Sequence, residues 1–457
     1  MLLKQKNTSS LVVMMGRRRI GKSYLLKKYA ESFSKVFLFD GLAPHEKQTN
    51  EMQLAHFAKQ LSEQTGVPGF KFGDWTDALK ALAKQVSKGV TFVLLDEISW
   101  MGKHDPDFPG KLKSVWDSDF LKNPNLVFAV CGSVSSWIEK NILKSSDFLG
   151  RISFQMTLQE LPLNVIHYFT GKHKVPKSEL IRYACITGCV PKYLTEIRYG
   201  ASFDEEIQRL CFTAEGFLFN EYEKIFRDIF ERKTVSYKKV VNKLAEKKMS
   251  ANEVAKELGQ TLNSDISESL KILRSSGFLA RDYNYNADGT KSKLSVYRLK
   301  DNYLRFYIKK IEPIKNKIEM GDDFANWLTI REQMPSIIGM QFQNLVLNHL
   351  SEIIKGLEIP FSIIKSASPY FQKKTTKNKG ACQIDLLIQC NNDVWYVCEI
   401  KFKKIIDSKV KTEVERKLSI ISKPKSVKLR SALIYFGQAT PEILASFDKA
   451  LDVGSLV

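Results

Sequence analysis

One short segment constrains this chain more than any other. Residues 16–23 read Gly-Arg-Arg-Arg-Ile-Gly-Lys-Ser, which fits the phosphate-loop pattern G-x-x-x-x-G-K-[ST]. The apolar run Leu11–Met15 precedes it and predicts a strand buried on both faces of a parallel sheet. Apolar residues follow at helical spacing, namely Leu25, Leu26 and Tyr29. Strand, loop and helix in this order predict an α/β P-loop NTPase fold with a parallel sheet.

The loop residues have separate predicted tasks. Glycines at its two ends let backbone N–H groups curl around phosphates, which side chains there would obstruct. We expect Lys22 to reach the β- and γ-phosphates and Ser23 to hold Mg²⁺. The three arginines contact either neighbouring acids or DNA. The predicted cofactors are ATP and Mg²⁺, and the expected binding residues are Gly16, Arg17, Arg18, Arg19, Ile20, Gly21, Lys22 and Ser23.

Two further apolar runs end in polar residues, as strands of the same sheet would. Residues 91–95 precede Asp96 and Glu97. We expect Asp96 to hold the Mg²⁺ shell through water and Glu97 to polarise the attacking water. Residues 126–131 lead to Gly132 and Ser133. The Ser133 hydroxyl either senses the γ-phosphate and orients water or belongs to a simple turn.

Arg151 follows the third run after a short interval. As an arginine finger it would stabilise transition-state charge, within the chain or across subunits. The alternative is an ordinary arginine that is solvated or paired with an acid.

The chain carries a large positive charge. Its 457 residues include 70 Lys and Arg against 50 Asp and Glu, a formal net charge of +20. Such a field attracts polyanions, so DNA is the leading expected partner. Scattered lysines that only solubilise the surface would give the same total.

The sequence also indicates a compartment. No apolar run approaches the length of a membrane span, and residues 1–6 turn polar too early for a signal peptide. We therefore expect a cytoplasmic protein that makes no membrane contact. The seven cysteines lack zinc-site spacing, which predicts reduced thiols in the core.

The middle of the chain reads first as helices and then as a more basic segment. The mostly helical pattern from Leu161 to Arg232 predicts a lid on the ATPase. Between Glu231 and Lys310 there are 18 Lys and Arg against 9 Asp and Glu. The positive balance is therefore concentrated in this segment.

The basic segment carries the pattern of a winged helix-turn-helix. Ser250–Glu253 predicts a capping box that opens a helix through Leu258, and a second helix is expected at 264–276. Residues 278–285 and 293–299 predict a hairpin wing. Such a module binds either DNA or protein. The residues expected to face DNA are Lys271, Arg274, Lys291 and Lys293.

The C-terminal region contains a second group of acids. Residues 383–388 and 395–401 predict a hairpin, with Asp385 on one strand and Glu399 and Lys401 on one face of the other. Two carboxylates that hold Mg²⁺ and a lysine that stabilises developing charge would suit a phosphodiesterase. Asp385, Glu399 and Lys401 are therefore candidate catalytic residues.

Together these motifs resemble the archaeal-type ATPases of the AAA+/STAND group, whose P-loop commonly reads GRRRxGKT or GRRRxGKS. Further matches are Leu95-Asp96-Glu97, Gly132-Ser133, Gly150-Arg151 and the segment Thr187–Leu194, which looks like GG-x-P-x-YL. The resemblance covers nearly the whole chain. It implies a winged helix after the ATPase and a C-terminal domain of unknown function similar to PD-(D/E)XK nucleases.

Two departures from this family affect the predicted sites. Relatives usually carry an FxGR-like segment before the first strand, but only Met1–Ser10 precedes it here. This predicts either a displaced start or weaker recognition of the base. The family pattern G-x-x-FE places a glutamate before the hairpin, where this chain has Gln343. The resemblance thus implies an impaired metal site, unless Gln343 is an ordinary surface residue.

The expected fold is therefore an α/β P-loop NTPase with a parallel sheet and a helical lid, a winged helix-turn-helix and an α/β nuclease-like domain. The expected function is an ATPase that binds DNA and couples nucleotide state to the C-terminal domain. The alternative is a non-nucleolytic STAND-like regulator in which ATP gates protein or DNA binding. A homo-oligomer or an unknown protein partner stays open. The predicted boundaries are 1–160, 161–230, 231–312, a linker at 313–334, and 335–457.

Overall fold

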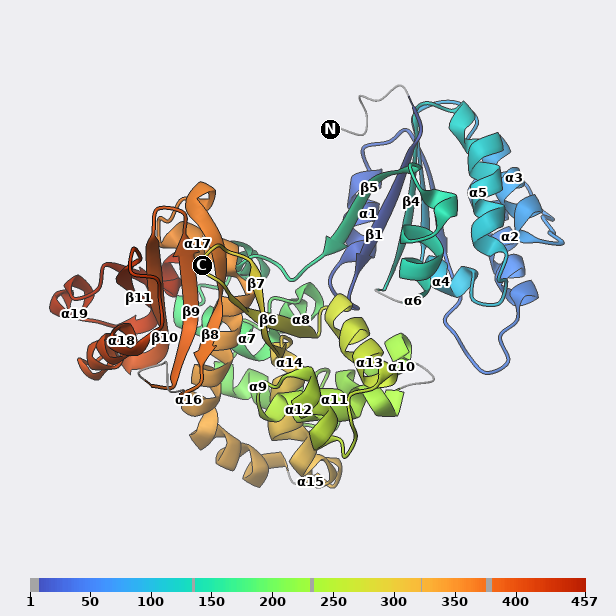
Figure 1. Cartoon of the computed structure of the whole chain (residues 1–457). Coiled ribbons are helices and arrows are strands. Elements are labelled where there is room, and N and C mark those ends of the chain that lie inside the picture. Colours follow the sequence, from blue (N-terminus) through green and yellow to red (C-terminus); the bar gives the residue numbers. More distant parts are fainter. Residues whose placement is uncertain (1–7, 134–135, 231–233, 322, 375–379) are drawn as a thin grey trace. The chain divides into compact units, whose positions relative to one another are not determined.

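The computed structural model describes residues 8–133, 136–230, 234–321, 323–374 and 380–457 (Figure 1). The chain forms two compact units, an N-terminal unit of residues 1–159 and a C-terminal unit of residues 160–457. Most of Met1–Ser10, the segment compared with FxGR, lies outside the described residues, and so does the predicted boundary at Glu231.

A five-stranded parallel sheet forms the centre of the N-terminal unit, as the sequence predicts. Its strand order is β2-β3-β4-β1-β5, and every pair is parallel. The strands are β1 (Ser10–Gly16), β2 (Lys35–Asp40), β3 (Thr91–Asp96), β4 (Leu126–Ser133) and β5 (Ile152–Leu158). The helices are α1 (Lys22–Ala30), α2 (Asn50–Thr65), α3 (Trp75–Gln85), α4 (Ile98–Met101), α5 (Phe108–Ser118) and α6 (Ser136–Ile138).

Helices cover both faces of this sheet, which explains why its central strands are apolar along most of their length. Side chains of β1 alternate between two cores. Val12 and Met14 pack with Leu26 of α1, whereas Leu11 and Val13 pack with α2, α3 and α5. Of the apolar residues at helical spacing, Leu26 lies on the buried face of α1, whereas Leu25 is 42% exposed.

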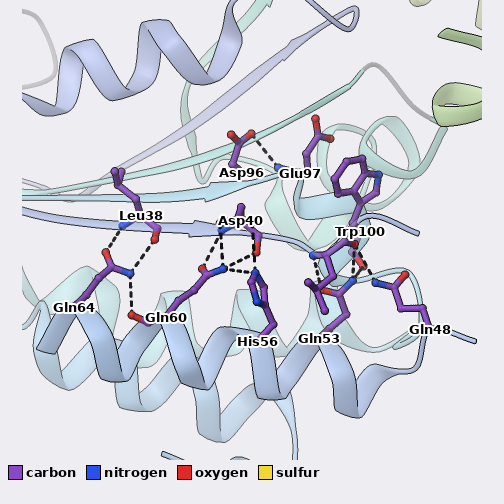
Figure 2. A network of polar contacts seen from close by, with 11 residues as sticks. Leu38, Asp40, Gln48, Gln53, His56, Gln60, Gln64, Asp96, Glu97 and Trp100 are labelled. Carbon is purple, nitrogen blue, oxygen red and sulfur yellow. Dashed lines mark hydrogen bonds and ion pairs between the residues drawn. The ribbon is translucent and has the colours of Figure 1, made fainter. Parts of the chain in front are cut away.

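Glutamine side chains of α2 cover the outer edge of β2 and of the residues that follow it (Figure 2). Gln64 accepts from the N–H of Leu38 and donates to its carbonyl, at 2.7 and 2.8 Å. Gln60 makes the same pair of bonds with Asp40, at 3.0 and 3.1 Å. Gln53 makes the same pair of bonds with Leu42, just beyond the end of β2, both at 3.0 Å. We call Gln53, Gln60 and Gln64 the glutamine ladder.

The C-terminal unit begins with helices and contains one large continuous core. This core joins apolar side chains from Leu163 to Val453. The four segments that the sequence analysis predicts after residue 160 therefore pack around one core. The helices before the hairpin are α7 (Lys177–Thr187), α8 (Pro191–Thr195), α9 (Phe203–Cys211), α10 (Glu221–Phe230), α11 (Thr234–Glu246), α12 (Ala251–Glu257) and α13 (Ser264–Ser275).

The predicted helix, turn, helix and hairpin are present within residues 234–321. Ser250 and Glu253 form the predicted capping box at the start of α12. Gly259 and Gly277 follow α12 and α13 with φ of 72° and 82°, a conformation that favours glycine. The hairpin consists of β6 (Leu279–Tyr285) and β7 (Lys291–Leu299), which are antiparallel.

The hairpin packs against the C-terminal sheet. Asn284 of β6 donates to the carbonyl of Phe371 at 2.7 Å and accepts from its N–H at 3.2 Å. At the hairpin turn, a Cβ on Gly289 would lie 3.1 Å from the Lys365 side chain. The hairpin therefore covers the edge of this sheet along part of its length.

The linker prediction is wrong in one respect. A single helix, α16 (Asp323–Asn348), continues through Pro335 instead of ending near Met334. Proline removes one helical hydrogen bond and clashes with the preceding turn. Here the apolar residues before and after it are buried in the same core, which holds both halves in one helix. The neighbouring helices are α14 (Asn302–Phe306), α15 (Lys315–Glu319) and α17 (Leu350–Gly356).

The chain ends in a mixed sheet of order β12-β11-β10-β9-β8. Its strands are β8 (Ile364–Gln372), β9 (Cys382–Cys390), β10 (Val394–Ile405), β11 (Lys428–Gln438) and β12 (Lys449–Asp452), and its helices are α18 (Lys409–Ile420) and α19 (Pro441–Ala445). β9 and β10 form the predicted antiparallel hairpin, whereas β10, β11 and β12 are parallel. All seven cysteines are free and buried, as predicted. In the described part of the chain we find no helix with the length and apolarity needed to span a membrane.

Candidate functional site

The carboxyl ends of three parallel strands meet at one edge of the N-terminal sheet. Gly16 at the end of β1 pairs with Ser133 at the end of β4. Asp96 ends β3, the neighbour of β4 on its other side. Because all three strands point the same way, residues far apart in sequence lie together after folding.

The loop between β1 and α1 follows a tight path. A Cβ on Gly16 would lie 2.8 Å from the carbonyl oxygen of Leu158, so this position has no room for a side chain. Gly21 has φ 89° and Arg19 has φ 69°, both in the left-handed region. The buried Lys22 side chain turns back into the loop, where its ammonium donates to the carbonyl of Arg17 at 3.2 Å.

Asp96 and Glu97 stand next to this loop in a constrained turn. Glu97 has φ 51°, which is unusual for a residue with a side chain. Its N–H donates to Asp96 Oδ1 at 3.1 Å, and its Oε2 accepts from the Ser133 N–H at 3.3 Å. Burial raises the pKa of Glu97, and the Asp96 carboxylate raises it further, while Lys22 lowers it.

The residues at this edge fit a nucleotide phosphate and its metal. The loop carries backbone N–H groups and the Lys22 ammonium, and Ser23 lies in the first turn of α1 beside them. Asp96 supplies a nearly buried carboxylate on the adjacent strand. A bound Mg²⁺ would neutralise phosphate charge, and Ser23 and Asp96 would hold it.

Arg151 lies at the amino-terminal end of β5, away from the carboxyl strand ends where the loop lies. It precedes β5, whose first residue Ile152 pairs with Leu11, whereas Leu158 pairs with Gly16. Six strand residues at about 3.3 Å each separate Arg151 from the loop by roughly 20 Å. Its guanidinium donates to both carboxylate oxygens of Asp117, at 2.7 and 2.8 Å. An arginine finger within the same chain is therefore wrong, while a role across subunits stays a prediction.

In the C-terminal unit, the structure brings Gln343 of α16 to Asp385 of β9. The Gln343 amide donates to Asp385 Oδ1 at 2.6 Å, and the N–H of Ile400 donates to Oδ2 at 3.0 Å. Burial, together with the nearby Glu399 carboxylate, raises the pKa of Asp385 to about 6. Gln343 is thus not an ordinary surface residue.

Glu399 is held by two lysines. Its Oε1 lies 2.7 Å from the Lys401 ammonium, and its Oε2 accepts from Lys417 of α18 at 2.5 Å. Both lysines also pair with Glu413, at 3.1 and 3.4 Å. Burial lowers the pKa of Lys401, but bonding and attraction to Glu399 and Glu413 outweigh it and raise the value to about 12. Sequence reasoning missed Glu413 and Lys417.

We call this group of side chains the C-terminal polar cluster; its members are Gln343, Asp385, Glu399, Lys401, Glu413 and Lys417. As arranged, the cluster does not fit a divalent cation. All four carboxylate oxygens of Asp385 and Glu399 already face N–H donors. Within the residues that the structure describes, no three His, Cys, Asp or Glu side chains come together to hold a metal ion. Glu399 and Lys401 do share one face, as predicted.

The residues expected to face DNA are exposed. Lys271 and Arg274 lie on the exposed face of α13, and Lys291 and Lys293 lie on β7. The α13 surface also carries Asp265 and Glu268, so it is of mixed charge.

The fold and the loop define the class of the N-terminal unit. It is an AAA-type P-loop ATPase domain, because residues 8–164 match the family described as "AAA domain". Residues 307–415 match a second family, described as "Archaea bacterial proteins of unknown function". The chain therefore combines an AAA domain with a second region, residues 307–415, that matches this other family.

Among individual proteins, the chain is similar to the uncharacterized protein MJECL04 of Methanocaldococcus jannaschii. The two are 25% identical over 409 residues, 89% of this chain and 85% of the relative. Of solved structures, the Walker-type ATPase PABY2304 of Pyrococcus abyssi matches at 15% identity and TM-score 0.49, covering 67% of this chain and 92% of that one. The ORC2 protein of Aeropyrum pernix matches at 16% identity and TM-score 0.39, covering 68% and 89%.

The position of Arg151 leads to a prediction. Arg151→Ala should leave the affinity for ATP unchanged within about twofold, because the guanidinium pairs with Asp117 at the far edge of the sheet. A titration with a fluorescent ATP analogue measures this, with Lys22→Ala as the control that loses binding. A large loss of affinity in monomeric Arg151→Ala would contradict the placement.

Proposed function

We propose that the N-terminal unit binds and hydrolyses ATP, with the segment 16–23 around the phosphates and Glu97 as the residue that polarises water. The observation that carries this proposal is the meeting of Lys22, Asp96, Glu97 and Ser133 at one sheet edge. Ser23 and Asp96 hold Mg²⁺ in this proposal. A carboxylate with a raised pKa beside a phosphate site suits proton transfer from an attacking water.

Two substitutions separate the proposed roles. Lys22→Ala should abolish ATP binding, because the loop loses its buried ammonium. Glu97→Gln should bind ATP normally and hydrolyse it at least about 100-fold more slowly, because an amide cannot accept the proton. Binding and turnover are measured on the same preparations. Wild-type turnover in Glu97→Gln would remove Glu97 from the proposed role.

We further propose that α11, α12, α13 and the β6–β7 hairpin form a winged helix-turn-helix that binds DNA. The support is the order of the elements, the positive balance of the segment and the exposure of Lys271 and Arg274 on α13. The hairpin lies against β8 through Asn284, so α13 is the element left to enter a groove.

DNA affinity should therefore fall steeply with salt. Each phosphate contact contributes about −0.9 to the slope of log affinity against log salt concentration. Combining Lys271→Glu with Arg274→Glu should reduce the steepness of that slope by about two contacts. The double variant Lys59→Glu and Lys80→Glu, on α2 and α3, changes the net charge equally and is the control. If both double variants change the salt dependence equally, DNA binding reflects only non-specific attraction to positive charge.

The proposed function is completed by coupling, in which the nucleotide state changes how DNA is held by the C-terminal unit. A second candidate is a STAND-like regulator that gates DNA or protein binding without cutting DNA. The engaged oxygens of Asp385 and Glu399 favour this second candidate. An assay of ATP turnover and DNA cleavage on one sample, with and without Mg²⁺, decides between them. Metal-dependent cleavage that Asp385→Ala abolishes would favour the first.

A further inference from the structure

Gln53 connects the edge of the N-terminal sheet to the segment that carries Glu97 (Figure 2). Its side chain is buried, and its Oε1 accepts from the Leu42 N–H at 3.0 Å. Its Nε2 donates both to the Leu42 carbonyl at 3.0 Å and to the Trp100 carbonyl at 3.1 Å. Both amide hydrogens and the oxygen are therefore used, which fixes the orientation of this side chain.

Trp100 passes this constraint on to Glu97. It lies in α4, a single turn that begins directly after Glu97, and its N–H donates to the Glu97 carbonyl at 2.8 Å. Positive φ is strained at a residue with a side chain, so surrounding contacts must hold Glu97 in this conformation. Gln53 binds the other end of the same turn.

Close packing of Gly41 supports the same arrangement. Its N–H donates to the Asp96 carbonyl at 3.1 Å. A Cβ at this position would lie 3.0 Å from the Glu97 carbonyl oxygen and 3.1 Å from the Trp100 side chain. The backbone that Gln53 clamps is therefore pressed against the turn that carries Glu97.

We propose that Gln53 is a positioning residue for ATP hydrolysis, which fixes α4 through Trp100 and so aims the Glu97 carboxylate. This rests on the proposed role of Glu97. Gln60 is its matched control, since it also lies on α2 and binds β2 through a buried amide but makes no bond to α4.

The test compares Gln53→Met with Gln60→Met. Gln53→Met should lower kcat about 10- to 100-fold and leave KM and ATP affinity within about twofold, because small misplacements of reacting groups are costly. Gln60→Met should lower thermal stability comparably and leave kcat unchanged. Should Gln53→Met fail to fold, Gly41→Ala disturbs the same turn and should also lower kcat.

A double variant shows whether the effect passes through Glu97. In a Glu97→Gln background, adding Gln53→Met should change the residual turnover little, because residues that act as one unit are not additive. If Glu97→Gln is slow but Gln53→Met and Gly41→Ala turn over normally, the positioning role is wrong and the proposed function survives. If Glu97→Gln itself turns over normally, the proposed function has failed.

Lys417 carries an independent inference about the C-terminal polar cluster. Its side chain is 5% exposed and its ammonium lies 2.5 Å from Glu399 and 3.4 Å from Glu413. The cluster sets three carboxylates, on Asp385, Glu399 and Glu413, against the ammonium groups of Lys401 and Lys417. Five charges thus leave one net negative charge without any metal.

We infer that the Lys417 ammonium takes the place that a divalent cation would hold beside Glu399, so that the cluster is complete without a metal. A buried charge is costly unless it is paired, and Lys417 pairs Glu399 within the chain. A bound cation would have to displace the N–H donors that face all four oxygens of Asp385 and Glu399. Gln343 adds to this, because its amide supplies one of those donors.

The test measures Mn²⁺ binding to nucleotide-free full-length protein by titration and by the shift in thermal unfolding. Wild type should bind no more Mn²⁺ than Asp385→Asn, and its melting temperature should not respond. Lys417→Ala should lower the melting temperature and gain a Mn²⁺ site that restores it, and Asp385→Asn should remove that site. The exposed Lys411 on the same helix supplies the control Lys411→Ala.

Two outcomes would overturn the inference. One is Mn²⁺ binding by wild type that Asp385→Asn abolishes, which needs no Lys417 variant. The other is folded Lys417→Ala that gains no metal site. Should Lys417→Ala not fold, the comparison of wild type with Asp385→Asn decides alone.

Discussion

Burial of carboxylates is the constraint on which both polar sites of this protein depend. Asp96 and Glu97 lie at the end of the apolar strand β3, and Glu399 lies in the middle of β10, where water is largely excluded. A carboxylate in such a place needs donors or cations within reach. At the nucleotide site these are the Ser133 N–H and the nearby Lys22. In the C-terminal unit, two lysines supply the whole compensation to Glu399.

The two sites therefore differ in how much charge is left to be compensated. At the carboxyl ends of the parallel strands, the Lys22 ammonium donates to the carbonyl of Arg17 in its own loop, and an anionic ligand bound there would add to the arrangement. In the C-terminal polar cluster, donors from α16, β10 and α18 already meet the acids. The first arrangement is suited to binding and turnover, and the second to holding elements of the fold together.

Much of the architecture follows from local sequence. Continuous apolar runs predicted β1, β3 and β4, and Ser250 with Glu253 predicted the start of α12. Prediction from the sequence failed where long-range packing determines the structure. Pro335 lies inside a helix because one core buries the residues on both sides of it. Arg151 appeared close to the nucleotide because strand direction, which sets the edge at which it lies, is not visible in one dimension.

The sequence around Lys417 contains a pattern that could have predicted the burial of this residue. Val410 and Val414 precede it at spacings of seven and three residues, so the helical period places Lys417 on the buried face of α18. A lysine at such a position needs a buried acid. The partner comes from β10, and no local pattern connects the two. The glutamine ladder escaped notice for the same reason, since its partners are backbone atoms of another element.

The glutamine ladder also limits where another strand can join this sheet. An outer strand normally exposes N–H and C=O groups that another chain can join. At β2, the amides of Gln60 and Gln64 take up these groups on alternate residues, Leu38 and Asp40, much as a neighbouring strand would. At the other edge, β5 carries the exposed side chains of Phe154 and Met156. An incoming strand would therefore find its bonding positions at β2 already taken by side chains of the same chain.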